Sequence, residues 1–425
     1  MECHIYSNSS LGLFGKCASL VVTIVNIIMQ NSEMFTGLKV VELASVLAGP
    51  SVGQFFTELG AQVIKVENLK TGGDITRTWK GKNENDTGVS AYFTSVNWGK
   101  KSLAIDLTKK EGRDIIYQLT AKADVVIASY KPGDAEKLGV DYNTLIQHNP
   151  SLIYGQVTGY GPDNERVGYD AVIQAESGFM DLNGEPEGAP LKMPVALIDV
   201  LAGHHLKEGL LLALLKRERT GRGDLVEVSL IQAAITSLAN QAANWLVTNQ
   251  LPVRKGSAHP NIAPYGDTYL TKDQKRVLLA IGSDRQFSDL CKMLGLTELV
   301  SNPKFATNPQ RVKNREDLNV ELQTGVSLIN AHDFTTGCER FKIPAGIIQN
   351  LKEVFEMEEA REILIHGDQL AGIRNVVCTC SRRLPNISDI SLPPLFGQHS
   401  EEILKDTLRL SSEQIATLRQ SKVIN

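Results

Sequence analysis

Several signals are absent from this 425-residue sequence, and each absence disfavours a class of protein. There is no dense basic run and the net charge is −4, which argues against nucleic acid as a partner. The six cysteines are scattered, without the spacing of a disulfide framework or a zinc site, so a reducing compartment fits best. The apolar stretch from Cys17 to Met29 is shorter than the roughly 20 residues that span a bilayer. We therefore expect no metal site and no membrane partner.

Familiar nucleotide-binding and hydrolase motifs are missing as well. The glycines of the first expected strand-to-helix turn, in Gly49-Pro50-Ser51-Val52-Gly53, match neither the G-x-G-x-x-G fingerprint nor a P-loop. No G-x-S-x-G elbow is present, which argues against a Ser-His-Asp hydrolase. His204 and His205 are adjacent, which is not a zinc-binding spacing on a helix. NAD-dependent, ATP-dependent and hydrolytic chemistry are all disfavoured.

Composition and length indicate a globular protein of more than one domain. The chain is 42% hydrophobic and 22% charged, and its length favours about two or three domains. We place a large domain at 34–254 plus 341–425 and a smaller α+β domain at 255–340. Residues 1–33 differ from the rest, and we expect a disordered segment, a leader or a start assigned upstream of Met34. The expected compartment is the cytoplasm, or the mitochondrion if that segment is a leader in a eukaryote.

Strand and helix patterns alternate from Leu38 onward. Strands are predicted at 38–43, 63–66, 103–107, 125–128 and 152–157, with helices at 51–59, 111–121 and 142–148. This alternation predicts an α/β fold with a doubly wound, mostly parallel Rossmann-like sheet. A helix N-terminus after the first strand can receive an anionic group, so Val46 and Leu47 are candidate backbone contacts to a nucleotide-bearing ligand.

Asp199 is the residue that the local sequence marks most strongly for chemistry. It closes the apolar run 193–198, which we interpret as a buried strand end, and a helix from near Leu201 to Arg219 follows. Helix amides pointing at this carboxylate would keep it ionised and fixed in direction, as a nucleophile requires. The alternative is an ordinary N-cap aspartate. The glycine and small side chains of loop 256–260 would let backbone amides approach an acyl group.

The ordered set of motifs in this chain resembles that of the family III CoA-transferases, the CaiB/BaiF family. The motifs are Leu43–Pro50, Leu59–Glu67, Gly73-Asp74 with Arg77, Gly159–Gly161, Gly168–Asp170, Thr220–Gly223, Ile262–Tyr265 and Leu395–His399. The similarity covers nearly everything from Met34 to the end. The resemblance implies a large CoA-binding domain, an interlocked homodimer, and a CoA thioester as substrate with no permanently bound cofactor.

The resemblance also assigns the catalytic role. It implies that Asp199 attacks the thioester of a donor acyl-CoA, and that an aspartyl-CoA thioester then passes CoA to an acceptor acid. Gly256, Ser257 and Ala258 are candidate oxyanion contacts through their backbone amides. Their loop lacks the glycine-rich form of oxalate-specific members, and Leu47 replaces the glutamine of those members. Oxalate is therefore disfavoured as the acceptor.

The residues suggested for CoA binding lie in three segments of the large domain. They are Val46, Leu47, Ile105, Ser129, Tyr130, Lys131 and Lys137. Tyr130 is suited to stack on adenine, while Lys131 and Lys137 are suited to meet phosphates, although surface lysines are usually just solvated. Asn68 stands where a basic residue is expected, so Lys70 or Arg77 is a candidate replacement.

Glutarate-specific members resemble this chain well, through segments 256–259 and 262–265. We therefore expect succinyl-CoA as donor and a small dicarboxylic acid as acceptor. Tyr169 is a candidate substrate contact, and Arg77 or His259 is a candidate to bind the second carboxylate, although each could equally be structural.

Two alternatives remain. Alpha-methylacyl-CoA racemases of the same family carry a histidine where Tyr169 stands, because proton exchange at an alpha carbon needs a base on each face. Tyrosine is a poor base at neutral pH, which favours the transferase. From a different class, the chain could be a non-catalytic CoA-binding protein, against which the intact Asp199 argues.

Overall fold

The computed structural model describes residues 34–84, 88–367, 369–379, 385–388 and 390–425. The expectations for residues 1–33 lie outside these described residues. The described chain divides into two compact units, which are treated separately. Unit 1 comprises 34–167, 199–229 and 365–425, and unit 2 comprises 168–198 and 230–364. No helix within the described ranges is long and apolar enough to cross a membrane.

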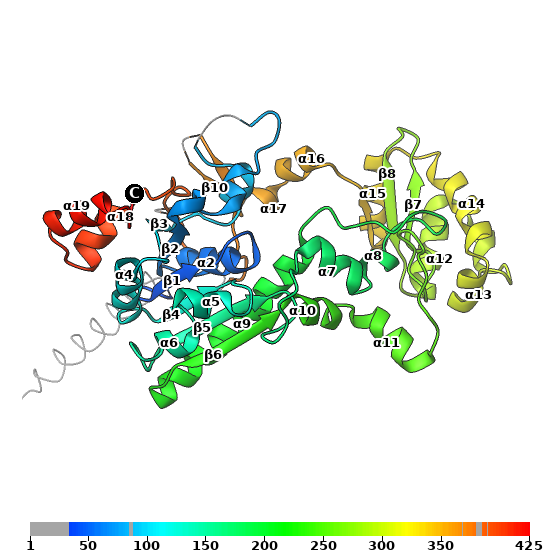
Figure 1. Cartoon of the computed structure of the whole chain (residues 1–425). Helices are drawn as coiled ribbons and strands as arrows, with labels where there is room; N and C mark the ends of the chain where they lie inside the picture. The colour runs from blue at the N-terminus through cyan, green and yellow to red at the C-terminus, as the bar shows by residue number, and fades with distance from the viewer. Residues whose placement is uncertain (1–33, 85–87, 368, 380–384, 389) are drawn as a thin grey trace, which may run out of the picture. The chain divides into compact units, whose positions relative to one another are not determined.

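Unit 1 is built on a six-stranded parallel sheet (Figure 1). Its strands are β1 Lys39–Leu43, β2 Gln62–Asn68, β3 Lys101–Ile105, β4 Val125–Ala128, β5 Ile153–Thr158 and β6 Asp224–Ser229. Their spatial order is β3-β2-β1-β4-β5-β6, so the predicted doubly wound parallel fold is confirmed. The winding reverses between β1 and β4. In such sheets, ligands bind beyond the carboxyl ends of the strands at this switch point.

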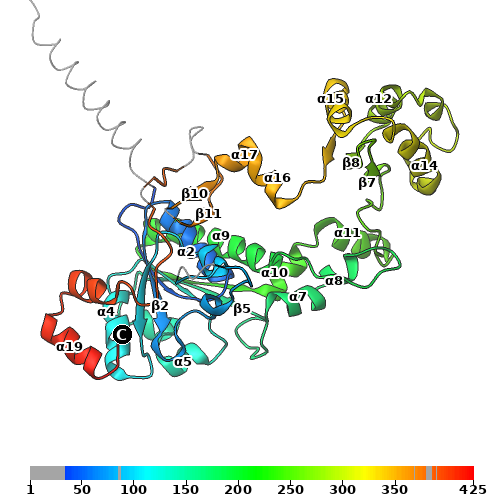
Figure 2. The same cartoon turned by 90° about the horizontal axis from the view of Figure 1, so that it is seen from above.

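Helices cover both faces of this sheet. The helices of unit 1 are α2 Ala48–Glu58, α3 Ala91–Thr94, α4 Lys110–Thr120, α5 Asp134–Leu138, α6 Tyr142–Leu145, α9 Leu197–Thr220, α18 Ser400–Glu402 and α19 Ser412–Gln420, with shorter turns η1 Leu69–Thr71, η2 Ile75–Thr78 and η4 Ile403–Thr407. Figure 2 shows α9 beside α2, and the two pack on the same face of the sheet. On the opposite face, α4 and the C-terminal segment share one apolar core with the strands.

The C-terminal segment returns to the sheet of unit 1. Ile424 forms an antiparallel bridge with Ile105 at the end of β3. The Asp106 amide donates a hydrogen bond of 2.8 Å to the Val423 carbonyl. Val423 and Ile424 are both buried in the core of unit 1. A short pair of strands, β10 Leu364–His366 and β11 Ala371–Ile373, comes just before this segment.

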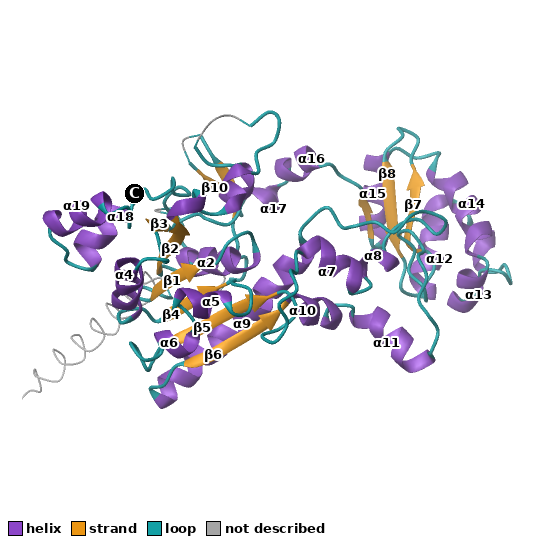
Figure 3. Ribbon diagram, viewed as in Figure 1, coloured by secondary structure: helices purple, strands orange, loops and turns teal. Residues whose placement is uncertain are grey.

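Unit 2 is a smaller α+β body (Figure 3). Its strands β7 Tyr265–Leu270, β8 Arg276–Ala280 and β9 Ala345–Ile347 form one antiparallel sheet. Its helices are α7 Asp170–Glu176, α8 Phe179–Leu182, α10 Leu230–Thr236, α11 Ala239–Thr248, α12 Asp284–Leu294, α13 Asn308–Lys313, α14 Arg315–Val326, α15 Ala331–Phe341, α16 Leu351–Glu356 and α17 Glu358–Arg361, with the turn η3 Thr297–Val300. Side chains of α12, α14 and α15 bury one face of this sheet.

The structure differs from the sequence expectations in two places. The strand expected at 193–198 is wrong, because α9 already begins at Leu197 and the preceding residues form a loop with exposed Met193 and Val195. The apolar run contains Pro194 and has no neighbouring strand, so nothing supports extended pairing. The two units also divide the chain differently from the predicted domains. Residues 168–198, 230–254 and 341–364, which were expected in the large domain, fall in unit 2, where α7 packs against α10.

Candidate active site

Asp199 lies in the first turn of the long helix α9. It is the third residue of that helix and is only 7% exposed. It lies inside the helix rather than before it, so it is not an N-cap residue. The first turn of a helix carries unpaired backbone amides and the positive end of the helix dipole, and both favour a negative charge. The environment expected for Asp199 is thus provided by the helix itself and not by a strand end.

A second carboxylate, Asp170, holds the start of the same helix. Its Oδ1 accepts a hydrogen bond of 2.7 Å from the backbone amide of Ile198, the residue before Asp199. Its Oδ2 accepts one of 2.7 Å from Gln174 Nε2. Sequence reasoning used the Gly168-Tyr169-Asp170 motif only for the resemblance and missed this role. The signal in the sequence was an acidic residue within this motif, and the structure shows that its side chain is buried.

A glycine lets α9 approach α2 closely, one turn after Asp199. A Cβ atom at Gly203 would lie 2.5 Å from Ser51 Oγ and 3.2 Å from the Ala48 carbonyl oxygen. A larger residue at this position would require the Ser51 side chain to rotate and the two helices to move apart slightly. The turn that carries Asp199 is therefore held against the beginning of α2, which follows the loop after β1.

That loop contains a strained residue. Val46 has φ +71°, in the left-handed region that β-branched residues avoid, at a typical cost of about 1–2 kcal/mol. Its backbone amide donates to both carboxylate oxygens of Asp74, at 3.2 and 3.3 Å. The neighbouring Ser45 amide donates to Ser129 Oγ at 3.0 Å. The loops after β1 and β4 are thus joined at the switch point, where Val46, Leu47 and Ser129 all lie.

The other CoA candidates follow β4, with one exception. Tyr130 is partly buried against the core, and burial raises the pKa of its hydroxyl to about 12, so the ring stays neutral. Lys131 and Lys137 are exposed, and the Asp134 carboxylate 3.0 Å from Lys137 Nζ raises the pKa of that lysine. Ile105 differs because its side chain is completely buried in the core. It is therefore not a side-chain contact for a ligand.

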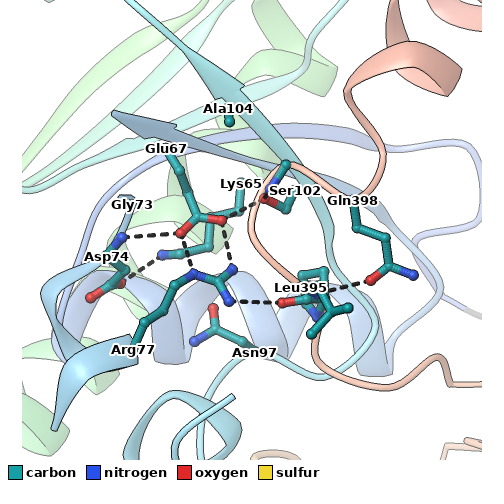
Figure 4. Close-up of polar contacts among 12 residues, drawn as sticks. Lys65, Glu67, Gly73, Asp74, Arg77, Asn97, Ser102, Ala104, Leu395 and Gln398 are labelled. Carbon is teal, nitrogen blue, oxygen red and sulfur yellow. Dashed lines mark hydrogen bonds and ion pairs between the residues drawn. The ribbon is translucent and has the colours of Figure 1, made fainter. Parts of the chain in front are cut away.

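Arg77 is part of a buried polar cluster and not of an open site (Figure 4). Its Nε and Nη2 donate to the two Glu67 carboxylate oxygens at 2.8 and 2.7 Å. Its Nη1 donates to the Pro394 carbonyl at 3.0 Å, and the guanidinium lies 3.7 Å from the centre of the Phe93 ring. These contacts correct the expectation that Arg77 binds an acceptor carboxylate. Arg77 has the structural role that the sequence left open.

A layer of buried charges continues from this cluster beneath the loop after β1. Lys65 Nζ lies 2.9 Å from Glu42 Oε1 and 3.0 Å from Asp74 Oδ2, and Lys100 Nζ lies 2.7 Å from Glu42 Oε2. Burial opposes the charge on Lys65, but Glu42, Asp74 and Glu67 outweigh it and raise its pKa above the ordinary value. Burial lowers the pKa of Lys100 to about 8, against the opposing effect of Glu42.

Asp74 stays ionised within this layer. Burial alone would raise its pKa, but the charge of Lys65 and hydrogen bonds from Thr76 hold the pKa of this carboxyl below its ordinary value. The Thr76 amide and hydroxyl donate to Asp74 Oδ1 at 3.1 and 2.8 Å. The carboxylate that receives the Val46 amide is therefore a fixed negative charge.

In unit 2, the candidate oxyanion loop has already used two of its three amides. The Gly256 amide donates to the Gly184 carbonyl at 3.1 Å, and the Ala258 amide donates to the Lys255 carbonyl at 3.0 Å. Neither can donate to an oxyanion in this conformation. Across the described parts of the chain, the Ser257 amide makes no hydrogen bond, so it remains the candidate in this loop.

His259 and Tyr169 keep groups that could meet a substrate. His259 Nδ1 accepts a hydrogen bond of 3.1 Å from the Asn261 amide, so the neutral ring carries its proton on Nε2 and can donate it. The same ring packs edge to face against Tyr265, with 5.1 Å between the ring centres. Tyr169 is 54% exposed and directly precedes α7.

A hollow of about 400 Å³ adjoins the candidate loop within unit 2. Its lining includes Lys255, Gly256 and Ala258 of the loop and Gln241 and Asn244 of α11. Its size is that of a small-ligand pocket. Among the residues that the structure describes, no group of three His, Cys, Asp or Glu side chains is arranged to hold a metal ion.

The fold and the site together define a class of protein. They describe an α/β protein with a buried carboxylate in the first turn of a helix and two hydrogen-bonded loops at the switch point of a parallel sheet. The model of CoA-transferase family III matches residues 35–400, so the chain belongs to this family.

Relatives of known name and structure agree with this assignment. The succinate–glutarate CoA-transferase of Agrobacterium fabrum is 36% identical, with 87% of this chain and 95% of that protein covered. The human succinyl-CoA:glutarate CoA-transferase is 34% identical, with 93% and 91% covered. A crystal structure of a CaiB/BaiF family protein from Brucella suis is 38% identical, covers 88% of this chain and 98% of its own, and has a TM-score of 0.76. The chain is a family III CoA-transferase, and its substrates are a CoA thioester and a carboxylic acid.

Proposed function

We propose that this protein transfers CoA from succinyl-CoA to a small dicarboxylic acid through a thioester on Asp199. The observation that carries the proposal is the position of Asp199, a buried carboxylate in the first turn of α9. Relatives support the substrate class by their names, which include succinate, glutarate, D-citramalate and mesaconate. All four of these acids carry two carboxyl groups.

The proposed reaction exchanges one acyl bond at a time. An Asp199 oxygen attacks the thioester carbon, the C–S bond breaks, and an aspartyl anhydride and CoA thiolate form. The thiolate attacks the aspartyl carbonyl, which releases the donor carboxylate and leaves an aspartyl-CoA thioester. The acceptor carboxylate attacks that thioester, the C–S bond breaks, and an anhydride between the acceptor and Asp199 forms with release of CoA thiolate. The thiolate then attacks the acceptor carbonyl of this anhydride. The product is acceptor-CoA with Asp199 restored, and no ATP is needed because one thioester replaces another.

The remaining residues take binding roles in this proposal. Lys131 and Lys137 meet CoA phosphates, and Tyr130 stacks on adenine. Val46, Leu47 and Ser129 contact the ligand at the switch point. In unit 2, the Ser257 amide stabilises an oxyanion, while Tyr169 and His259 contact the acceptor, with His259 Nε2 donating to its second carboxylate. We also propose a homodimer, on the family resemblance.

The nucleophile is tested by trapping. Wild-type protein is incubated with succinyl-CoA and hydroxylamine, and peptide mass spectrometry locates the hydroxamate. We expect it on Asp199, and we expect Asp199→Asn to lower transfer by at least about 10³-fold, as removal of a nucleophile does. Asp333→Ala is the matched control, because Asp333 is an exposed aspartate in the first turn of α15. Hydroxamate at another carboxylate, or an active Asp199→Asn, would contradict the proposal.

The acceptor is tested with a panel of glutarate, citramalate, mesaconate and oxalate, scored by new CoA thioesters. Transfer to at least one of the longer dicarboxylates supports the proposed class. Exchange of the alpha proton of a branched acyl-CoA, without any new thioester, would instead identify a racemase. Binding of CoA with neither reaction would identify a binding protein.

A further inference from the structure

The Gly73-Asp74 motif takes no part in the proposed transfer chemistry, yet Asp74 contacts the loop after β1. That loop holds Val46 in a left-handed backbone conformation, φ +71°. A β-branched residue does not adopt this conformation without support from its surroundings. The support is visible in the structure, because the Val46 amide lies 3.2 and 3.3 Å from the two Asp74 carboxylate oxygens.

Asp74 is itself held rigidly from three sides. Its carboxylate is paired with Lys65 at 3.0 Å, and both side chains are only 1% exposed. Its backbone amide donates to Glu67 Oε1 at 3.0 Å. Thr76 donates two hydrogen bonds to Oδ1. The carboxylate therefore has one orientation, and Val46 must adjust to it.

Gly73 makes this arrangement possible. Its φ is +92°, and a Cβ atom there would lie 2.5 Å from Glu67 Oε1 and 2.8 Å from the Phe396 ring. The glycine lets the chain turn tightly over Glu67, so that the next residue, Asp74, points back under the loop after β1. The pairing of Gly with Asp in this motif thus has a physical reason.

We propose that Asp74 is a positioning residue for CoA, holding Val46 in the conformation that binds the nucleotide; this rests on the proposed function. Without the carboxylate, the loop relaxes to ordinary backbone conformations, and only a fraction of molecules presents the binding-competent turn. The apparent dissociation constant rises by the inverse of that fraction. Because Asp74 does not meet the reacting atoms, turnover at saturating acyl-CoA changes little.

The test uses the full-length chain and a repair experiment. We expect Asp74→Ala to raise both the CoA dissociation constant, measured by calorimetry, and the acyl-CoA KM by roughly tenfold, with kcat within about twofold of wild type. In the double variant Val46→Gly, Asp74→Ala, glycine adopts positive φ without strain. We expect this variant to recover most of the lost affinity relative to Asp74→Ala.

Two further variants separate positioning from stability. Asp74→Asn is the second variant, to be used if Asp74→Ala does not fold, because it keeps the side-chain size and one acceptor oxygen. We expect it to raise the CoA dissociation constant and the acyl-CoA KM by less than Asp74→Ala does. Asp124→Ala is the matched control, because Asp124 Oδ2 accepts the Lys39 amide at 2.8 Å at the opposite end of β1. We expect Asp124→Ala to lower stability and leave the CoA dissociation constant unchanged.

The outcomes are distinct. Unchanged CoA affinity in folded Asp74 variants, or no recovery on adding Val46→Gly, overturns the proposal. A wild type that binds CoA but transfers none to any acid refutes the proposed function, while the affinity comparison still decides the role of Asp74. A wild type that binds no CoA overturns both.

Discussion

Glu42 is the residue whose replacement tests the buried charge layer most directly. Its carboxylate is completely buried between two ammonium groups, Lys65 at 2.9 Å and Lys100 at 2.7 Å. Lys100 also donates to the Pro50 carbonyl at 2.8 Å and to Asn97 Oδ1 at 2.9 Å. Glu42→Gln keeps the size of the side chain and removes its charge. Lys65 retains Asp74, so the charge left without a carboxylate is that of Lys100.

The expected loss of stability is about 3–5 kcal/mol, the usual cost of removing one partner from a buried ion pair. Its pH dependence follows from Lys100, whose native pKa of about 8 is below the unfolded value of 10.5. Between these values the unfolded state binds the proton more strongly, so stability rises with pH. Loss of Glu42 lowers the native pKa of Lys100 further. The deficit of Glu42→Gln is therefore largest in acid and shrinks as pH rises to about 8.

The assay is unfolding in urea, monitored by hydrogen exchange of the β1 and β2 amides, which reports on unit 1 alone. Glu402→Gln is the control, because Glu402 pairs with Lys101 at 2.6 Å in a half-exposed position and should matter by less than about 1 kcal/mol. The double variant Glu42→Gln, Lys100→Met also removes the buried ammonium charge of Lys100, which has no carboxylate partner in Glu42→Gln. It should recover most of the lost free energy of unfolding. A cost no larger than that of the control, or a deficit that grows with pH, would refute the reasoning.

Two further predictions concern single positions. Gly73→Ala should destabilise the protein by about 2–4 kcal/mol in urea unfolding, because its φ is +92° and the methyl group would lie 2.5 Å from a carboxylate oxygen. Gly72→Ala, at φ +75° in open space, should cost only about 1 kcal/mol, and equal costs would contradict the clash. Of the described cysteines, exposed Cys378 should react first with iodoacetamide in peptide mapping. Burial raises the pKa of the Cys291 and Cys338 thiols to about 12, so early labelling of either would show that unit 2 opens.

Much of the candidate site was predictable because it depends on local sequence. Val46 and Leu47 follow the first strand and precede a helix, whose N-terminus can receive an anionic group. Ser129 was suggested by the family resemblance, and it follows β4, which ends at the same edge of the parallel sheet. Asp199 stood at the start of a long helical pattern, and a helix terminus has the same electrostatics whatever precedes it. The error about residues 193–198 has the same origin. A short apolar run is compatible with a strand or with a loop and helix start, and periodicity alone does not separate them.

The roles of other residues were decided by partners far away in the chain. Val46 and Asp74 are 28 residues apart, and Arg77 reaches a carbonyl 317 residues away. Arg77 became structural because Glu67 and the returning C-terminal segment enclose it. The Gly256 amide likewise became unavailable through the distant Gly184 carbonyl, whereas the Ala258 amide pairs locally with the Lys255 carbonyl.

The sequence by itself determined the alternation of strands and helices, and with it a parallel doubly wound sheet, since hydrophobic periodicity and turn residues act over short distances. Its ordered motifs also determined the family. Only the tertiary structure decided the strand order, the left-handed conformation of Val46 and the pairing of charges beneath it. The reason is physical: burial makes an unpaired charge costly, and which charge meets which carboxylate depends on how distant segments pack.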